Sequence, residues 1–122
     1  MEDKFKHWLE SIPREESRLC TASCWAPAAD IYQTDEGWLV KFDLSGVRPE
    51  DIRLHIHGRR LIVAGIRRDR SQQAGLRFYR MEISYNSFQR SVELPGEIDE
   101  ARVQSEFQDG MLLVRLCERN AP

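Results

Sequence analysis

The sequence lacks the short motifs that catalysis usually requires. It contains no G-x-x-x-x-G-K-[ST] or G-x-G-x-x-G run, whose glycines let backbone N–H groups cradle the phosphates of a nucleotide. The G-x-S-x-G nucleophile elbow and the H-E-x-x-H zinc motif are also absent. Its acidic residues are scattered among basic ones, as on a solvated surface. We therefore predict a binding protein that is not an enzyme and that uses neither a cofactor nor a metal.

Long apolar runs and cysteines are also scarce. No run approaches the roughly 18 apolar residues that a membrane helix requires, and the opening MEDKFKHWLE is too charged for a secretory signal. Three cysteines, an odd number, without a secretory segment indicate a reducing cytoplasm. Cys20 and Cys24 are close in sequence, but only His7 accompanies them in this region. We interpret them as thiols that bind no metal.

Charge of one sign does not dominate, since the formal net charge is -2 over 122 residues. Such a balance gives no bulk attraction to nucleic acid or to an anionic membrane. Residues 67–80 differ, because they hold five arginines and one acid. A basic segment with aromatic residues is typical of single-strand nucleic-acid binding. A single patch on a neutral chain instead favours pairing with acids such as Glu82 or acids on another subunit. We predict neither nucleic acid nor membrane as a partner.

The chain is long enough for one domain with a single core, and it divides into three regions. Residues 1–24 form an N-terminal arm, residues 25–116 a domain, and residues 117–122 a short tail. Four apolar residues of the arm recur at the spacing of one helical face: Phe5, Trp8, Leu9 and Ile12. So short a helix must dock on something. Either it covers its own domain or a sister subunit, or it binds exposed apolar segments of other proteins.

Residues 25–116 alternate between apolar and polar side chains in short runs separated by turn signals, which predicts strands. Asp109-Gly110 is the strongest hairpin turn. The expected strands are 29–33, 38–44, 52–57, 61–66, 88–94, 103–107 and 111–116. Many short strands with only one helical pattern predict an all-β fold, an antiparallel β-sandwich of the immunoglobulin-like kind.

Three basic residues stand out on these strands. Arg90 shares a face with Phe88 and Val92, and because it cannot lose its charge it needs a carboxylate partner or a subunit edge. His55 and His57 project to one outward face, a spacing that suits a metal or a pH sensor. Since no third ligand is identifiable, we predict a solvated strand face there.

The order of these segments resembles the α-crystallin domain of the small heat-shock proteins of the bacterial, archaeal and plant type. The resemblance extends from Trp25 to Leu116 and is carried by six motifs in the family's order. They are D-I-Y at 30–32, D-L-S-G-V-R-P-E-D-I at 43–52, L-I-V-A-G-I-R at 61–67, F-Y-R-M-E at 78–82, S-F-Q-R-S-V-E-L-P at 87–95 and S-E-F-Q-D-G-M-L at 105–112.

The resemblance implies an ATP-independent holdase chaperone that binds unfolding client proteins and limits their aggregation. An adaptor of the related CS-domain sandwich, which binds one folded partner, is the alternative. The resemblance also implies a homodimer by exchange of the 67–80 loop, whose short strand Leu76–Arg80 would pair with the edge Asp30–Gln33 of the partner. It assigns the dimer contact to Arg90, Asp30, Ile31, Tyr32, Leu76, Phe78, Tyr79 and Glu82.

A groove that receives a tail motif is a further feature of the family. The resemblance locates it between Ile52–Ile56 and Val103–Phe107. No I-x-I or V-x-I follows Leu116, so we expect a dimer or small oligomer. The groove would then serve another partner or be closed by the arm. Its expected client-binding residues are Ile52, Leu54, Ile56, Val103 and Ser105.

Overall fold

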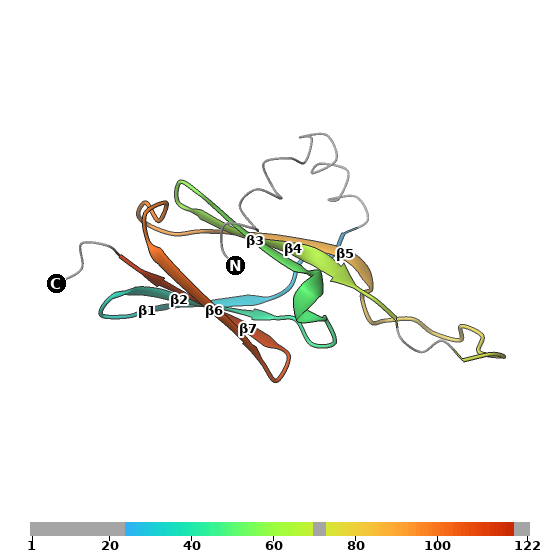
Figure 1. The fold of residues 1–122 in the computed structure, drawn as a ribbon. Coiled ribbons are helices and arrows are strands. Elements are labelled where there is room, and N and C mark those ends of the chain that lie inside the picture. Colours follow the sequence, from blue (N-terminus) through green and yellow to red (C-terminus); the bar gives the residue numbers. More distant parts are fainter. Residues whose placement is uncertain (1–23, 70–72, 119–122) are drawn as a thin grey trace.

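The computed structural model describes residues 24–69 and 73–118, which form two antiparallel sheets stacked as layers of a sandwich (Figure 1). The arm helix predicted over residues 5–12 lies outside the described residues. One sheet has the order β1 (Ala29–Gln33), β2 (Gly37–Asp43), β7 (Met111–Cys117) and β6 (Arg102–Gln108). The other has the order β3 (Ile52–His57), β4 (Arg60–Arg67) and β5 (Asn86–Glu93). A single 3-10 turn, η1 (Pro49–Asp51), leads into β3. The predicted antiparallel β-sandwich is confirmed.

The strands form where the side-chain period is two, and this period assigns each residue to a face. Val40 and Phe42 of β2 lie opposite Val114 and Leu112 of β7, and all four are buried. Each of the seven strands predicted from the alternation is present, and its bounds differ from the prediction by at most two residues.

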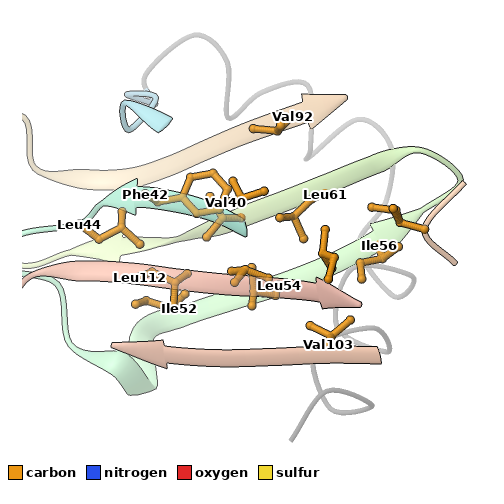
Figure 2. Close-up of a cluster of buried hydrophobic side chains, with 14 of the residues drawn as sticks. Val40, Phe42, Leu44, Ile52, Leu54, Ile56, Leu61, Val92, Val103 and Leu112 are labelled. Carbon is orange, nitrogen blue, oxygen red and sulfur yellow. The ribbon is translucent and has the colours of Figure 1, made fainter. Parts of the chain in front are cut away.

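The core lies between the two sheets, and both layers contribute to it. Figure 2 shows these side chains directed into the interlayer space. The buried cluster contains Val40, Phe42, Leu44, Val47, Ile52, Leu54, Ile56, Leu61, Val63, Phe88, Val92, Leu94, Ile98, Val103, Leu112, Val114 and Leu116. Burying so many branched and aromatic side chains is the main force that holds the layers together.

The connections differ greatly in length. The β6–β7 hairpin turns at Asp109 and Gly110, whose φ angles of 53° and 80° lie in the left-handed region that this tight turn requires. The connection from β4 to β5 is much longer. Of its described residues, 73–85 are irregular and extend away from the sandwich in Figure 1 (yellow).

The described residues show the bonding state of Cys24 and Cys117 and whether a membrane-spanning helix is present. Cys24 is disulfide-bonded, so its interpretation as a thiol is wrong. Cys117, at the end of β7, is a free thiol whose Sγ lies 3.4 Å from the Glu36 carboxylate. No helix in 24–69 or 73–118 is long and apolar enough to cross a bilayer.

Gly65 in β4 provides a test of how tightly this end of the sandwich is packed. A Cβ added there would collide with the carbonyl oxygen of Asp51 and would lie 2.7 Å from the ring of Phe88. We expect Gly65→Ala to lower the free energy of unfolding by about 1–3 kcal/mol, because the buried ring has no free space to move into. Urea unfolding followed by circular dichroism measures this. Gly96→Ala is the control, since nothing lies within 4 Å of its added Cβ; equal losses would contradict the argument.

Candidate functional site

The loop between β4 and β5 exposes an unusual amount of apolar surface. Leu76 is 60% exposed, Phe78 83% and Tyr79 97%, and Met81 and Ile83 are exposed as well. We call residues 76–83 the apolar loop. Here Leu76–Arg80, expected as a short strand that pairs with a partner, is irregular in the single chain. Several exposed apolar residues gathered in one loop, here interspersed with charged ones, are typical of an interaction surface.

A second exposed feature is the edge strand β1. Within the described residues β1 pairs only with β2, so its other side presents unpaired backbone groups. Ile31 lies opposite the buried Val40, at the rim of the core, yet Ile31 and Tyr32 both remain substantially exposed. An unpaired edge with apolar side chains is suited to accept another strand.

The outward face of β1 carries a small polar cluster. The Lys41 ammonium lies 5.4 Å from the centre of the Tyr32 ring and 3.9 Å from the Asp30 carboxylate. A hydrogen bond with Tyr32, followed by the charges of Tyr32 and Asp30, raises the pKa of Lys41 above its ordinary value. Because these groups are largely solvated, the ion pair adds little stability.

Arg90 lies on the core side of β5 between Phe88 and Val92, as the alternation predicted. Its Nη1 donates a hydrogen bond of 3.2 Å to the backbone carbonyl of Pro27. The contact that the structure shows is therefore to a carbonyl rather than to the expected carboxylate. The alternative, a position at a subunit edge, stays a prediction.

The residues just before β1 cover the free edge of β5. The Trp25 N–H donates to the Ser87 carbonyl at 3.2 Å, and the Gln89 N–H donates to the Trp25 carbonyl at 3.1 Å. The two segments run parallel here, with Trp25 opposite Phe88 and their rings 5.2 Å apart. The chain thus adds a short strand-like segment to its own sheet.

Arg67, the last residue of β4, contacts three segments at the base of the long loop. We call this place, where Arg67 meets Ser84, the neck of the loop. Its Nε donates to the Ser45 carbonyl at 2.9 Å, and its Nη1 donates to the Ser84 carbonyl at 2.7 Å. Its guanidinium also lies 4.1 Å from the centre of the Trp25 ring, a cation–π contact. Sequence reasoning expected the loop arginines to pair with acids. That holds for Arg68, which bonds Asp51, but Arg67 uses carbonyl groups.

An open hollow of about 620 Å³ adjoins this neck. Its lining comes from the β2–β3 connection, from the end of β4 and from the far end of the loop. The lining residues are Ser45, Gly46, Val47, Arg67, Arg68, Asp69, Ile83 and Tyr85. No charge or spacing signal in the sequence pointed to it, because the hollow depends on three segments meeting at Arg67.

The residues expected to line a groove belong to two further edge strands. Ile52, Leu54 and Ile56 come from β3, whereas Val103 and Ser105 come from β6, and each strand ends its sheet. The four apolar residues are buried in the core cluster (Figure 2). Ser105 is half-buried. The structure thus gathers the apolar members between the layers, and their role as a binding groove stays a prediction.

The histidine pair on β3 is not the solvated face that the sequence predicted. His55 is only 8% exposed, although His57 is exposed as expected. The two rings are nearly parallel, with their centres 6.3 Å apart. No three His, Cys, Asp or Glu side chains of the described ranges come together as a metal site would require.

Comparison with known proteins supplies the family. A model described as the Hsp20/alpha crystallin family matches residues 30–122. A small heat shock protein of Rickettsia felis is 30% identical over 93 residues, covering 76% of this chain and 60% of that protein. Spore protein SP21 of Stigmatella aurantiaca is 34% identical over 95 residues, covering 78% and 56%. The chain therefore spans less than two thirds of the length of these relatives.

Solved structures show the same fold. The hspA structure from Xanthomonas axonopodis superimposes with a TM-score of 0.66 at 30% identity, covering 80% of this chain and 98% of that one. Heat shock protein 16.0 from Schizosaccharomyces pombe gives a TM-score of 0.70, covering 80% and 91%. At 24% identity this second likeness shows the fold alone.

The contact between Arg90 and Pro27 can be tested by substitution. Arg90→Ala would leave the carbonyl of the buried Pro27 without this donor, so we expect the free energy of unfolding to fall by about 1–3 kcal/mol. Arg115→Ala, at an exposed position on β7, is the control and should change it by less than about 0.5 kcal/mol. Denaturant titration of both variants measures the difference. An Arg90→Ala protein as stable as the parent would show that the contact is dispensable.

Proposed function

The chain belongs to the Hsp20/alpha crystallin family, and from this we propose that it is an ATP-independent holdase chaperone. Its relatives are small heat shock proteins, which supports a chaperone role. The finer proposal is that it binds unfolding proteins and limits their aggregation as a dimer or small oligomer in the cytoplasm. Its ligands would be polypeptides, with neither nucleic acid nor membrane among them.

The observation that carries the proposal is the combination of open sheet edges with apolar side chains. Within the described residues β1, β3 and β6 each have one unpaired side. An extended polypeptide can add to such an edge by main-chain hydrogen bonds, while pockets for alternate side chains give preference for apolar sequences. Unfolding proteins expose such extended apolar segments, and no fixed substrate geometry is required.

We propose that two of these features combine in a homodimer. The apolar loop of one subunit would lie along β1 of the other, so that Leu76 and Phe78 become buried and the edge of β1 is paired. The exposure of these two side chains and of Ile31 supports this arrangement. A loop that reaches a second subunit also accounts for its extension away from the sandwich (Figure 1).

The remaining edges, β3 and β6, are the surface that we propose for clients. Their apolar residues Ile52, Leu54, Ile56 and Val103 lie just behind the two unpaired edges. Ser105 is the half-buried position between Val103 and Phe107 on β6. A client segment added along either edge would contact this apolar row.

The dimer proposal predicts a change in mass when the apolar loop becomes charged. We expect Leu76→Asp with Phe78→Asp to weaken dimerisation by at least about 100-fold, since burying one large apolar side chain is worth about 1.5–3 kcal/mol. Sedimentation velocity over a concentration series measures the monomer–dimer equilibrium. Gln73→Asp is the control, an exposed position outside the expected strand. Unchanged dimerisation of the double variant would rule out the exchange of this loop.

The holdase proposal predicts that this protein suppresses light scattering by a heat-labile enzyme near equimolar ratio without ATP. We expect Ser105→Glu to reduce the protection several-fold, because the charge would lie among the apolar residues of the two edges. Gln104→Glu, on the outward face of the same strand, should keep full protection. If the unsubstituted protein fails to suppress scattering even in excess, the holdase proposal is wrong; if both variants protect fully, clients bind elsewhere.

A further inference from the structure

The side chains of β1 divide between two faces, and only one of these faces is polar. Strand residues alternate between the two sides of a sheet, so Ala29 and Ile31 share the core side of β1. Ala29 packs against the buried cluster, and Ile31 lies opposite Val40. Asp30 and Tyr32 share the outward side. A strand added at the free edge of β1 must therefore turn its apolar side chains toward the core side, whereas its charged side chains belong on the outward side.

The apolar loop has a matching alternation. In an extended conformation Leu76 and Phe78 share one side of this segment. Arg77 and Tyr79 share the other side. When the first pair turns toward the core side of β1, Arg77 necessarily lies on the outward side with Asp30. The opposite orientation would place an arginine at the rim of the core and leave Phe78 in solvent, and both changes cost free energy. The alternation thus decides which side chains of two subunits can meet.

Arg77 and Asp30 carry opposite charges, and both are accessible. Arg77 is exposed and forms no ion pair with another residue of the described ranges. The side chain of Asp30 is 66% exposed, and its ion pair with Lys41 is long, at 3.9 Å. Lys41 approaches Asp30 from β2, whereas an added strand would approach from the free edge of β1. The Asp30 carboxylate can therefore accept a second cation from that side.

We propose that Arg77 of one subunit pairs with Asp30 of the other across the joined edge, and that this pair fixes the orientation of the exchanged loop. The inference rests on the homodimer proposed above and adds a residue that decides which side of the loop faces the core. Side chains directly opposite on adjacent strands have Cβ atoms about 5 Å apart, and diagonal ones about 7–8 Å, both within reach of an arginine. The pair can thus form whether the loop runs parallel or antiparallel to β1.

Reversing the charge on each side of the pair tests the proposal. A reciprocal exchange forms the contact twice in each dimer. Asp30→Arg would bring two cations together at both places, and Arg77→Asp would bring two carboxylates together. We expect each substitution alone to weaken homodimerisation at least about tenfold in sedimentation velocity, because an attraction becomes a repulsion twice. A mixture of the two variant chains should dimerise again, since opposite charges would meet at both places of the heterodimer.

Native mass spectrometry of an equimolar mixture distinguishes the three dimers by mass. We expect heterodimers to outnumber the two kinds of homodimer together at least about fivefold, whereas indiscriminate pairing would give equal numbers. A variant that only misfolds cannot be restored by another defective chain, so restoration identifies the contact. Indiscriminate pairing in the mixture overturns the proposal. So do two variants that form homodimers as strongly as the parent protein.

Two controls make the same charge change elsewhere. Arg102→Asp, at an exposed position on β6, should leave homodimerisation unchanged. Arg80→Asp alters the loop on the side of Phe78, so it should not restore dimerisation when mixed with Asp30→Arg. Restoration by Arg80→Asp in place of Arg77→Asp would reverse the assigned orientation and overturn the proposal.

The same measurements separate this inference from the homodimer on which it rests. A parent protein that stays monomeric in sedimentation velocity overturns the homodimer and this pair together. A parent protein whose dimer is weakened by Leu76→Asp with Phe78→Asp, but not by either charge reversal, keeps the loop exchange and overturns the pair alone.

Discussion

A sandwich made of two open sheets has four edge strands, and the backbone groups along each edge require partners. This constraint organises the molecule. The edges are β1 and β6 in one sheet and β3 and β5 in the other. The chain covers β5 with its own backbone at Trp25. The other three edges have no strand beside them within the described residues, and we assign β1 to a second subunit and β3 and β6 to clients.

Two arginines stabilise the covered edge by a means that charge patterns do not reveal. Arg90 donates to the carbonyl of Pro27, and Arg67 donates to the carbonyls of Ser45 and Ser84. Backbone carbonyls outside strands lack ladder partners, and a guanidinium, with five N–H donors, can satisfy several of them. The chain before β1 is held against the sandwich by these contacts together with the stacking of Arg67 on Trp25.

The sequence predicts this fold where structure is decided locally. Alternation in β2 and the Asp109-Gly110 turn each depend on neighbouring residues, and both were predicted correctly. The partner of Arg90 could not be predicted in the same way, because it lies on a segment distant in sequence. Pro27 and Arg90 are 63 residues apart, and nothing near either one identifies the other. The exposed apolar loop was anticipated only through its resemblance to a family.

Stability and binding are assigned to different parts of the chain, and the neck at Arg67 shows how. The long loop leaves from Arg67 and returns at Ser84, and the hydrogen bond between them brings its ends together. Closing a loop costs free energy that rises only slowly with its length, so the loop can be long without weakening the core. Its exposed aromatic side chains contribute nothing to the buried cluster around Phe88. They are therefore free to contact a second polypeptide, while the sandwich provides the rigid support from which they extend.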